Sequence, residues 1–547
     1  MSAFKDSTVY QIYIKSFCDS NGDGIGDLNG IRYKLPYLKK MGVDYIWVTP
    51  FFPSPMFDNG YDVADYRAVN PLFGTMEDCE AMIAEADALG MGFMFDMVFN
   101  HTSWDHEWFR KALSGDPEYM DYYIFRDGKD GGPPVDWICG FGTPAWEYVP
   151  ALDKWYLHLF DKSQPDLNWE NPKVREELKN VIRFWKGKGV KGFRFDVFNL
   201  ISKPERIEDC APGSAHRYCK DGRHVHEFIR ELVTDTGIEA MVTVGEMAST
   251  TLDNCIRYSN PANHEVSMCF SFHHLKVDYK DGDKWALQPP DLLKLRGLFQ
   301  EWQEEMERGG GWNAVFWCNH DQPRIVSRFG DEGAYWKQSA KMLATFVHLL
   351  RGTPYIYQGE EIGMTNAGFT DIGQYDDVES RNYYRILLER GVTQADALRV
   401  LGQRSRDNGR TPMQWNAGEN AGFTTGSPWL RIPDNFRTIN VEAEEADPDS
   451  ILHYYRELVK LRKAYPIIAE GGIRFLETGN ERVLAYERSL NGQRLRVLCS
   501  FSRDTETIPA EADWSAGRVL IGTAPAERPA SGSMTLPPFA AFALLLS

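Results

Sequence analysis

Three features that mark secreted or membrane proteins are missing from this sequence of 547 residues. Its nine cysteines are scattered, odd in number and without a CxxC pair, so we expect free thiols in a reducing compartment rather than a disulfide framework. No run of about 18 apolar residues offers a membrane span. The first residues, MSAFKDSTVYQIYIKSF, lack the apolar core and cleavage site of a secretory signal. We therefore predict a cytoplasmic protein with no membrane partner.

An excess of positive charge is also missing. Lysine and arginine together number 60 against 78 aspartates and glutamates, and the formal net charge is −18. This balance excludes a nucleic-acid partner, because the phosphate backbone requires a basic surface. An anionic small molecule could bind only through a local site. The aromatic share of 13% is high, and aromatic faces stack well on sugar rings. We expect a monomer.

The chain is too long for one compact core, so two or three domains are expected. Roughly its first two thirds alternate β-rich runs with amphipathic helical stretches, which predicts an α/β fold built on a (β/α)₈ TIM barrel. Residues 102–168 interrupt this alternation, and the tail from 467 alternates like antiparallel strands. We predict a barrel over 1–101 and 169–466, an inserted domain over 102–168, and a C-terminal β-sandwich over 467–547. The predicted barrel strands are 9–14, 45–49, 92–99, 192–198, 240–245, 266–272, 314–318 and 354–358.

Acidic residues stand at the ends of four of these strands. The third, fourth, fifth and seventh end in FDMVFNH, FRFDVFN, VGEM and WCNHD. In a barrel the carboxyl ends of the strands meet on one rim, where barrel enzymes carry out their chemistry. A charge inside an apolar run is costly to bury unless it is paired or takes part in a reaction. The four ends therefore predict an active site with several carboxylic acids.

The motifs resemble those of the α-amylase family (glycoside hydrolase family 13), over essentially the whole chain. This resemblance implies a retaining glycosidase with Asp196 as nucleophile, Glu246 as general acid/base and Asp321 as transition-state stabiliser. Such an enzyme needs an ionised carboxylate about 5–5.5 Å from one that starts protonated. Arg194, on the same strand face as Asp196, could keep that carboxylate ionised. The matching motifs are DMVFNH (96–101), QPDLN (164–168), GFRFDV (192–197), GEM (245–247) and NHD (319–321).

The same resemblance implies a sugar-binding pocket. His101 and His320 would donate hydrogen bonds to hydroxyls of the glucose in the −1 subsite. DNGYD (58–62) supplies Asp58 and Tyr61, and RTPMQW (410–415) supplies Arg410. In exo-acting relatives the matching Asp and Arg pair closes the non-reducing end, so that one glucose is removed at a time. No organic cofactor is expected for this chemistry.

A metal-binding loop is predicted near the N-terminus. Residues 19–27, DSNGDGIGD, place oxygen-bearing residues at alternating positions between glycines, which suits a hard cation such as Ca²⁺. The glutamate that ends an EF-hand loop is absent, but the loop resembles the calcium loop of oligo-1,6-glucosidase-like members of the family. The alternative is an Asx-rich turn without metal. The structural ligands would be the side chains of Asp19, Asn21, Asp23 and Asp27 and the backbone carbonyl of Ile25.

Two segments bear on which glucoside is cleaved. Val197 follows the implied nucleophile, as in members that cleave α-1,6 bonds or trehalose 6-phosphate. HHLKVDYKDGDKW (273–285) resembles the branch that hydrolyses α,α-trehalose 6-phosphate to glucose and glucose 6-phosphate, and the implied substrate is therefore a sugar phosphate. His273, Lys276 and Lys284 match its phosphate-recognising positions, and charge-assisted hydrogen bonds from them could hold a dianion. Loop 204–222 departs from this branch.

Three alternatives stay open. An oligo-1,6-glucosidase acting on isomaltose or panose would use the same acids. A transglucosylase of the sucrose- or trehalose-isomerase type would also use them, but would exclude water from the intermediate. A non-catalytic relative associated with a transporter is the least favoured, because it would carry a transmembrane helix and lack the acids. Three aspartates offset the three lysines of 276–284, so the local charge alone does not decide between a phosphorylated and an unphosphorylated substrate.

Overall fold

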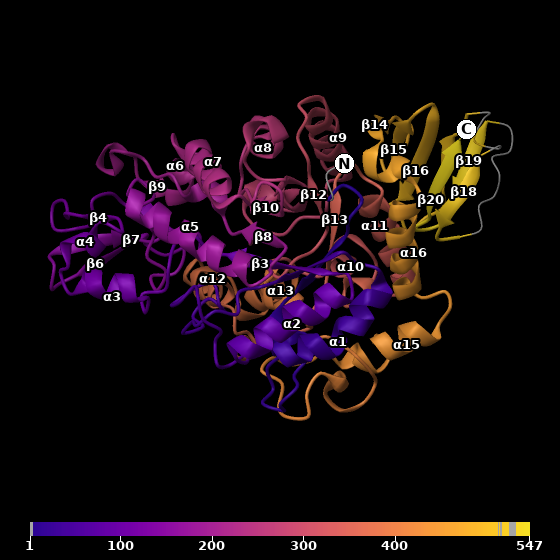
Figure 1. Ribbon diagram of the computed structural model, residues 1–547. Helices are drawn as coiled ribbons and strands as arrows, with labels where there is room; N and C mark the ends of the chain where they lie inside the picture. Colours follow the sequence, from indigo (N-terminus) through magenta and orange to yellow (C-terminus); the bar gives the residue numbers. More distant parts are fainter. Residues whose placement is uncertain (1–3, 512–513, 515–516, 525–531, 547) are drawn as a thin grey trace.

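The computed structural model describes residues 4–511, 514, 517–524 and 532–546 (Figure 1). A barrel of eight parallel strands lies at its centre, as predicted. A bridge between Cys269 and Asn313 joins the two outer strands of the sheet and closes it into the barrel. The strands, in their order around the sheet, are β11 (Met268–Phe270), β10 (Val242–Glu246), β8 (Gly192–Phe195), β3 (Gly92–Met97), β2 (Tyr45–Val48), β1 (Val9–Ile12), β13 (Thr353–Tyr357) and β12 (Ala314–Val315).

Nearly all residues of these strands are buried on both faces, as in sheets that helices cover from outside. The observed strands are mostly shorter than the predicted ones. β8, for example, ends at Phe195 because Val197 adopts a left-handed backbone conformation with φ of 37°. A short 3-10 turn, Phe198–Leu200, follows. The apolar pattern continues through this turn, so it could not indicate where the strand stops.

Helices cover the outside of the barrel (Figure 1). The helix that precedes β8 begins after Asn171, whose side chain accepts a hydrogen bond from the amide of Lys173, and it buries one apolar face, including Trp185. Capping thus fixes where this helix starts, and its apolar stripe fixes which face meets the sheet. The main helices are α1 (Leu28–Met41), α2 (Met76–Ala88), α5 (Pro172–Gly187), α7 (Val225–Thr236), α8 (Leu252–Ser259), α9 (Leu292–Arg308), α11 (Trp336–His348) and α16 (Ile451–Ala464).

Residues 102–168, between β3 and β8, fold beside the barrel, at the left of Figure 1. Their last residues return to the barrel rim, where Asp166 forms a β-bridge with His101 and a 2.7 Å ion pair with Lys203. The segment therefore forms a wall next to the acidic strand ends. It contains the short helices α3 (Glu107–Leu113) and α4 (Pro117–Met120), and an antiparallel sheet of β4 (Phe125–Arg126), β7 (Lys154–Leu157) and β6 (Trp146–Val149).

A second long segment, after β13, contributes four further helices. The ring of Trp285 stacks on Tyr383 in this segment, with centroids 4.6 Å apart, so the loop after β11 and the segment pack together. This contact brings two segments that are far apart in the sequence to one side of the site. The helices are α12 (Val378–Glu389), α13 (Gln394–Arg404), α14 (Asp407–Arg410) and α15 (Val441–Ala446).

The C-terminal part is antiparallel, as predicted. It packs on the barrel through Tyr486, whose hydroxyl donates to the carbonyl of Phe346 in α11 at 2.7 Å, and through the buried Arg488. Its strands form a five-stranded sheet, in the order β14 (Gly472–Leu476), β15 (Val483–Leu490), β16 (Gln493–Ser500), β20 (Ala541–Leu546) and β18 (Arg518–Gly522), and a pair, β17 (Glu506–Pro509) and β19 (Ser533–Leu536).

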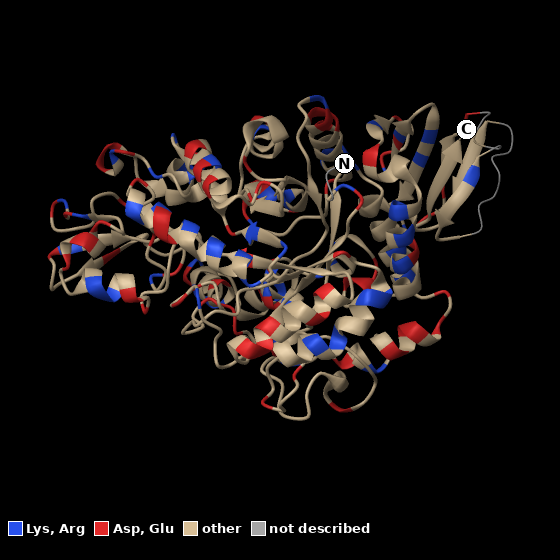
Figure 2. Cartoon of the chain, viewed as in Figure 1, with Lys and Arg blue, Asp and Glu red and all other residues tan. Residues whose placement is uncertain are grey.

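The surface carries charges of both signs, and the cysteines are unpaired. Acidic and basic residues are mixed along the outer helices (Figure 2). All nine cysteines are described by the structure and are free thiols, eight of them buried. Among the described residues, no helix combines the length and the apolar character that crossing a membrane requires.

Candidate active site

The guanidinium group of Arg194 is the centre of the acidic cluster. It is fully buried inside the barrel, and its Nη1 donates to Asp96 at 2.7 Å and to Asp196 at 2.6 Å. Its Nη2 contacts the carboxylate of Glu246. One planar cation therefore contacts three carboxylates, and such charge-assisted contacts fix the relative positions of the groups.

The strand register explains why these residues meet. Asp96 of β3 pairs directly with Arg194 of β8, and Val244 of β10 pairs with Arg194 from the other side. Asp196 follows Arg194 by two residues, and Glu246 follows Val244 by two. Because the side-chain period of a strand is two, all four groups project toward the same interior rim. The sequence predicted this convergence for the acids at the ends of the third, fourth and fifth strands, which are Asp96, Asp196 and Glu246.

Asp321 and His320 follow β12. The carboxylate of Asp321 accepts from Arg410 at 2.8 Å and from Arg406 at 3.3 Å, and its side chain is 28% exposed. Burial opposes the ionisation of Asp321, but His320 and the two guanidinium groups outweigh it and hold its pKa well below the usual range. Burial lowers the pKa of His320 to about 3, so at neutral pH the guanidinium groups supply the charge that keeps Asp321 ionised.

Asp58 and Arg410, both predicted to close the end of the pocket, are not ion-paired with each other. Asp58 pairs with Arg406 at 2.9 Å, whereas Arg410 binds Asp321 and the carbonyl of His320. Arg406 also contacts Asp377 at 2.6 Å. Arg406 and Arg410 are one helical turn apart, so only contacts distinguish which of them pairs with Asp58. Burial raises the pKa of Asp58 to about 7 against the opposing charge of Arg406.

The remaining predicted pocket residues lie around Tyr61. Its hydroxyl donates to Asp96 at 2.9 Å, and its ring stacks parallel to His320 with centroids 5.1 Å apart. The Nε2 atom of His101 lies 3.0 Å from the carbonyl of Tyr61, and the side-chain amide of Gln164 donates to Asp58 at 3.1 Å. The structure therefore brings Asp58, Tyr61 and His101 together. It adds Gln164, which stands in the QPDLN motif but was not singled out from the sequence.

Val197, directly after Asp196, has φ of 37° and ψ of 44°. A β-branched residue rarely adopts this conformation, and such strain concentrates at functional sites. The turn lets the chain leave β8 sharply, immediately after the carboxylate of Asp196. The strained residue therefore lies at the same rim of the barrel as the acidic residues.

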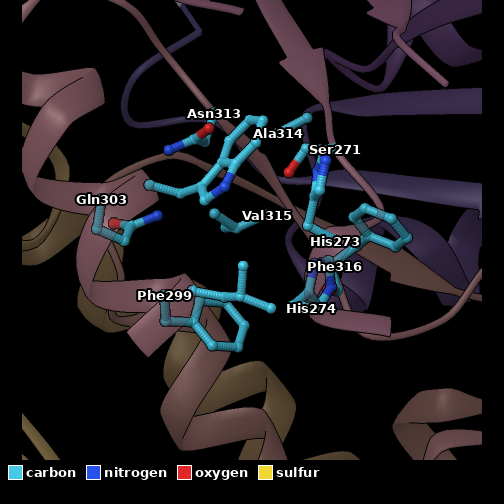
Figure 3. A pocket seen from close by; sticks show the side chains of 11 residues that line it. Ser271, His273, His274, Phe299, Gln303, Asn313, Ala314, Val315 and Phe316 are labelled. Carbon is cyan, nitrogen blue, oxygen red and sulfur yellow. The ribbon is translucent and has the colours of Figure 1, made fainter. Parts of the chain in front are cut away.

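The three positions predicted to bind phosphate have different surroundings. The Nζ atom of Lys276 donates to the hydroxyl of Ser249 at 2.7 Å, whereas Lys284 pairs with Glu379 of α12 at 2.6 Å. His273 stacks on Trp302 of α9, with centroids 4.6 Å apart, and lines a cavity of about 30 Å³ behind the barrel wall (Figure 3). This space suits a water molecule rather than a phosphate, so a phosphate that His273 recognises would have to lie outside it.

In the predicted metal loop, the side-chain oxygens of the aspartates accept hydrogen bonds from backbone amides. Asp19 accepts from the amides of Gly22 and Gly24, each at 2.8 Å. Asp27 caps α1 by accepting from the amide of Gly30 at 2.7 Å. Within the described part of the chain, no three His, Cys, Asp or Glu side chains converge as a metal site. Asn21 and the carbonyl of Ile25 would have to complete any cation site, and every donor would then be oxygen.

Comparison with known proteins identifies the class that this fold and site define. Residues 11–471 match the family model of the α-amylase catalytic domain, and the chain belongs to the α-amylase family of glycoside hydrolases. It is 49% identical to the trehalose-6-phosphate hydrolase of Bacillus subtilis (strain 168), over 98% of this chain and 97% of that protein. It is 46% identical to an oligo-1,6-glucosidase of Parageobacillus thermoglucosidasius, over 92% and 91%. The crystal structure of trehalose-6-phosphate hydrolase from Bacillus licheniformis matches with a TM-score of 0.95 and 46% identity, over 100% of both chains.

Proposed function

We propose that the protein is a retaining, exo-acting α-glucosidase that hydrolyses α,α-trehalose 6-phosphate to glucose and glucose 6-phosphate. The observation that carries this proposal is the guanidinium group of Arg194, which contacts both Asp196 and Glu246. Because one planar group reaches both carboxyl groups, they lie close together. This favours the short spacing of a retaining enzyme, about 5–5.5 Å, over the wider spacing that lets an inverting enzyme hold a water.

In the proposed reaction, Asp196 attacks C1 of the −1 glucose from its β face. The bond from C1 to the glycosidic oxygen breaks, its electron pair stays on that oxygen, and Glu246 donates the proton that completes the leaving sugar. Glu246 then takes a proton from water, which opens the β-glucosyl–Asp196 ester from the α face. Asp321, held by Arg406 and Arg410, would stabilise the transition state through the sugar hydroxyls.

The exo-acting part of the proposal rests on a closed pocket end. Asp58 and Arg406 form an ion pair in which both side chains are buried, and Gln164 adds a hydrogen bond to Asp58. A fixed pair of this kind recognises the hydroxyls of the terminal sugar unit. It leaves no room for a further sugar unit beyond that end. His101 and His320 would donate to hydroxyls of the same glucose.

The phosphate part of the proposal is supported by the 49% identical relative and by local charge. Lys276 forms no ion pair among the described residues, and its ammonium group is therefore available to an anion. Lys284 is paired with Glu379, so a phosphate would have to compete with this carboxylate. We propose that His273, Lys276 and Lys284 recognise the 6-phosphate of the sugar in the +1 subsite. The principal alternative is an oligo-1,6-glucosidase, the name of the 46% identical relative.

The decisive experiment compares wild-type kcat/KM for α,α-trehalose 6-phosphate, trehalose, isomaltose and sucrose. We expect trehalose 6-phosphate to be the best substrate, with free glucose and glucose 6-phosphate as products. The double variant Lys276→Ala with Lys284→Ala should raise KM for this substrate roughly 100-fold and change kcat little, because it removes binding rather than chemistry. A 4-nitrophenyl α-glucoside, which lacks the phosphate, is the matched control. A preference for isomaltose would reject the phosphate assignment, and isomerised products would reject hydrolysis.

We further propose that residues 19–27 hold a structural Ca²⁺ through Asp19, Asn21, Asp23, Asp27 and the carbonyl of Ile25. The oxygen-only donor set supports this, since Ca²⁺ prefers such ligands. The loop also joins distant parts of the chain, because Asp19 accepts from Thr424 in the segment after β13. A bound cation would hold these two segments together on the rim near α14, without taking part in catalysis.

Removal of Ca²⁺ with EGTA is expected to lower the melting temperature by roughly 5–10 °C, because a ligand that binds only the folded state stabilises it. Re-addition of Ca²⁺, but not of Mg²⁺ at the same concentration, should restore it. An Asp23→Ala variant should melt like the EGTA-treated protein and should not respond to Ca²⁺. Equal melting temperatures with and without EGTA, together with no bound metal in elemental analysis, would reject the site.

The cytoplasmic location remains a proposal supported by the nine free thiols, since reducing compartments keep thiols unpaired. That the protein is a monomer stays a prediction.

A further inference from the structure

Two lysines from different loops meet at Ser249, three residues after Glu246. The Nζ atom of Lys276 donates to the hydroxyl of Ser249 at 2.7 Å, and the Nζ atom of Lys220 donates to its carbonyl at 3.0 Å. Ser249 has φ of 53°, a left-handed conformation that is rare for residues other than glycine and typical of functional loops. The strained residue thus holds two ammonium groups beside the end of β10.

No carboxylate neutralises this pair of lysines. Neither Lys220 nor Lys276 takes part in an ion pair among residues 4–511, whereas Lys203 and Lys284 nearby are paired with Asp166 and Glu379. Burial lowers the pKa of Lys276, and the positive charge of Lys220 lowers it further. Two adjacent unpaired cations are unfavourable by themselves, and their repulsion is relieved when an anion binds between them.

Lys220 is held in place by its neighbour, Asp221. Asp221 also has a left-handed backbone, with φ of 51°, and its carboxylate accepts from Thr250 at 2.8 Å and from the hydroxyl of Tyr258 at 2.8 Å. Asn199 donates to the same carboxylate and accepts from the amide of Ala248. These contacts tie Lys220 to the loop that carries Ser249. The lysine is therefore positioned before any ligand binds, which reduces the entropy lost on binding.

We propose that Lys220 is a specificity-determining residue that binds the 6-phosphate of the substrate together with Lys276, across Ser249. The inference rests on the proposed function and extends it to a residue of loop 204–222, the segment that departs from the expected pattern. Glu246 protonates the glycosidic oxygen in that function, so the residues just beyond it face the leaving sugar. Two lysines carry the two positive charges that a dianionic phosphate matches.

The test is the substitution Lys220→Met, which keeps most of the side-chain volume and removes the charge. KM for trehalose 6-phosphate should rise roughly 10- to 100-fold with little change in kcat, because charged hydrogen bonds are lost from binding alone. KM for 4-nitrophenyl α-glucoside should stay at its wild-type value, and inorganic phosphate should become a weaker inhibitor of that reaction. Lys220→Arg should keep most of the phosphate preference. Lys280→Met, which changes an exposed lysine of the neighbouring loop, is the matched control.

The outcomes separate this inference from the function on which it rests. If the wild-type enzyme prefers trehalose 6-phosphate but Lys220→Met has unchanged KM, only the role of Lys220 is wrong. If Lys220→Met loses activity equally on both substrates, the residue is structural and the inference is also wrong. A wild-type preference for isomaltose over trehalose 6-phosphate would overturn both.

Discussion

Replacement of Asp196 by asparagine is expected to lower kcat by about 10⁴-fold or more while the protein stays folded. The amide is nearly the same size as the carboxylate and can still face Arg194, so the melting temperature should change little. It cannot form the glucosyl ester, however, and the loss of one member of a catalytic set removes most of the rate. Initial rates with trehalose 6-phosphate and with 4-nitrophenyl α-glucoside, together with a melting curve, check this prediction.

Azide distinguishes the nucleophile from the acid. In Asp196→Ala, azide can attack C1 from the vacated β face while the C1–oxygen bond breaks and Glu246 protonates the leaving group. The product of an α-glucoside should then be β-glucosyl azide. In Glu246→Ala, the β-glucosyl ester on Asp196 still forms from a substrate with a good leaving group, and azide attacks it from the other face to give α-glucosyl azide. If Asp196→Ala yields the α product, the two roles are exchanged.

The acids could be predicted from the sequence because their positions follow from period and register. Asp196 and Glu246 end apolar strands, and parallel strands align their carboxyl ends, so the two had to meet on one rim. Contact with Arg194 followed from its two-residue spacing to Asp196. The barrel itself was predictable for the same reason, since buried strands alternated with amphipathic helices. The predicted strands extended past the observed ends, as at Val197, where an apolar run continues through the turn.

Contacts between loops could not be predicted in this way. Arg406 and Arg410 are both buried arginines near one helix, and no periodicity indicates which of them pairs with Asp58. Lys284 matched a phosphate-binding position, but its partner Glu379 lies 95 residues away in the sequence, in α12. Lys220 carries no signal in the sequence, because it is a single lysine in an irregular loop; only the structure places it beside Ser249 and Lys276.

The single guanidinium group of Arg194 contacts three carboxylates at this site, and it therefore has two functions. It positions Asp196 against Glu246, and it offsets the cost of burying Asp96, whose side chain is fully enclosed. Trp47 and Tyr61 donate to the second oxygen of Asp96, but neither carries charge. Burial raises the pKa of Asp96 to about 6, although the charge of Arg194 opposes the shift. Catalysis and stability therefore depend on the same guanidinium group.

Replacement of Arg194 by methionine is expected to abolish activity and to destabilise the protein by about 3–5 kcal/mol at pH 8, because it leaves buried charges without a partner. The loss should be smaller at pH 5. Without Arg194 the pKa of Asp96 rises above 6, so the folded protein takes up a proton that the unfolded chain releases near pH 4. Where the folded state binds more protons, stability falls as the pH rises.

Denaturant midpoints of the wild type and of Arg194→Met, measured between pH 5 and pH 8, check this prediction. Arg194→Lys is the matched control, since it restores one charge but not the two-pronged contact with Asp196 and Glu246. It should recover most of the stability and little of the activity. A deficit of Arg194→Met that is the same at every pH would mean that the arginine stabilises the barrel by packing alone, against Trp47 at 4.9 Å, and not by its charge.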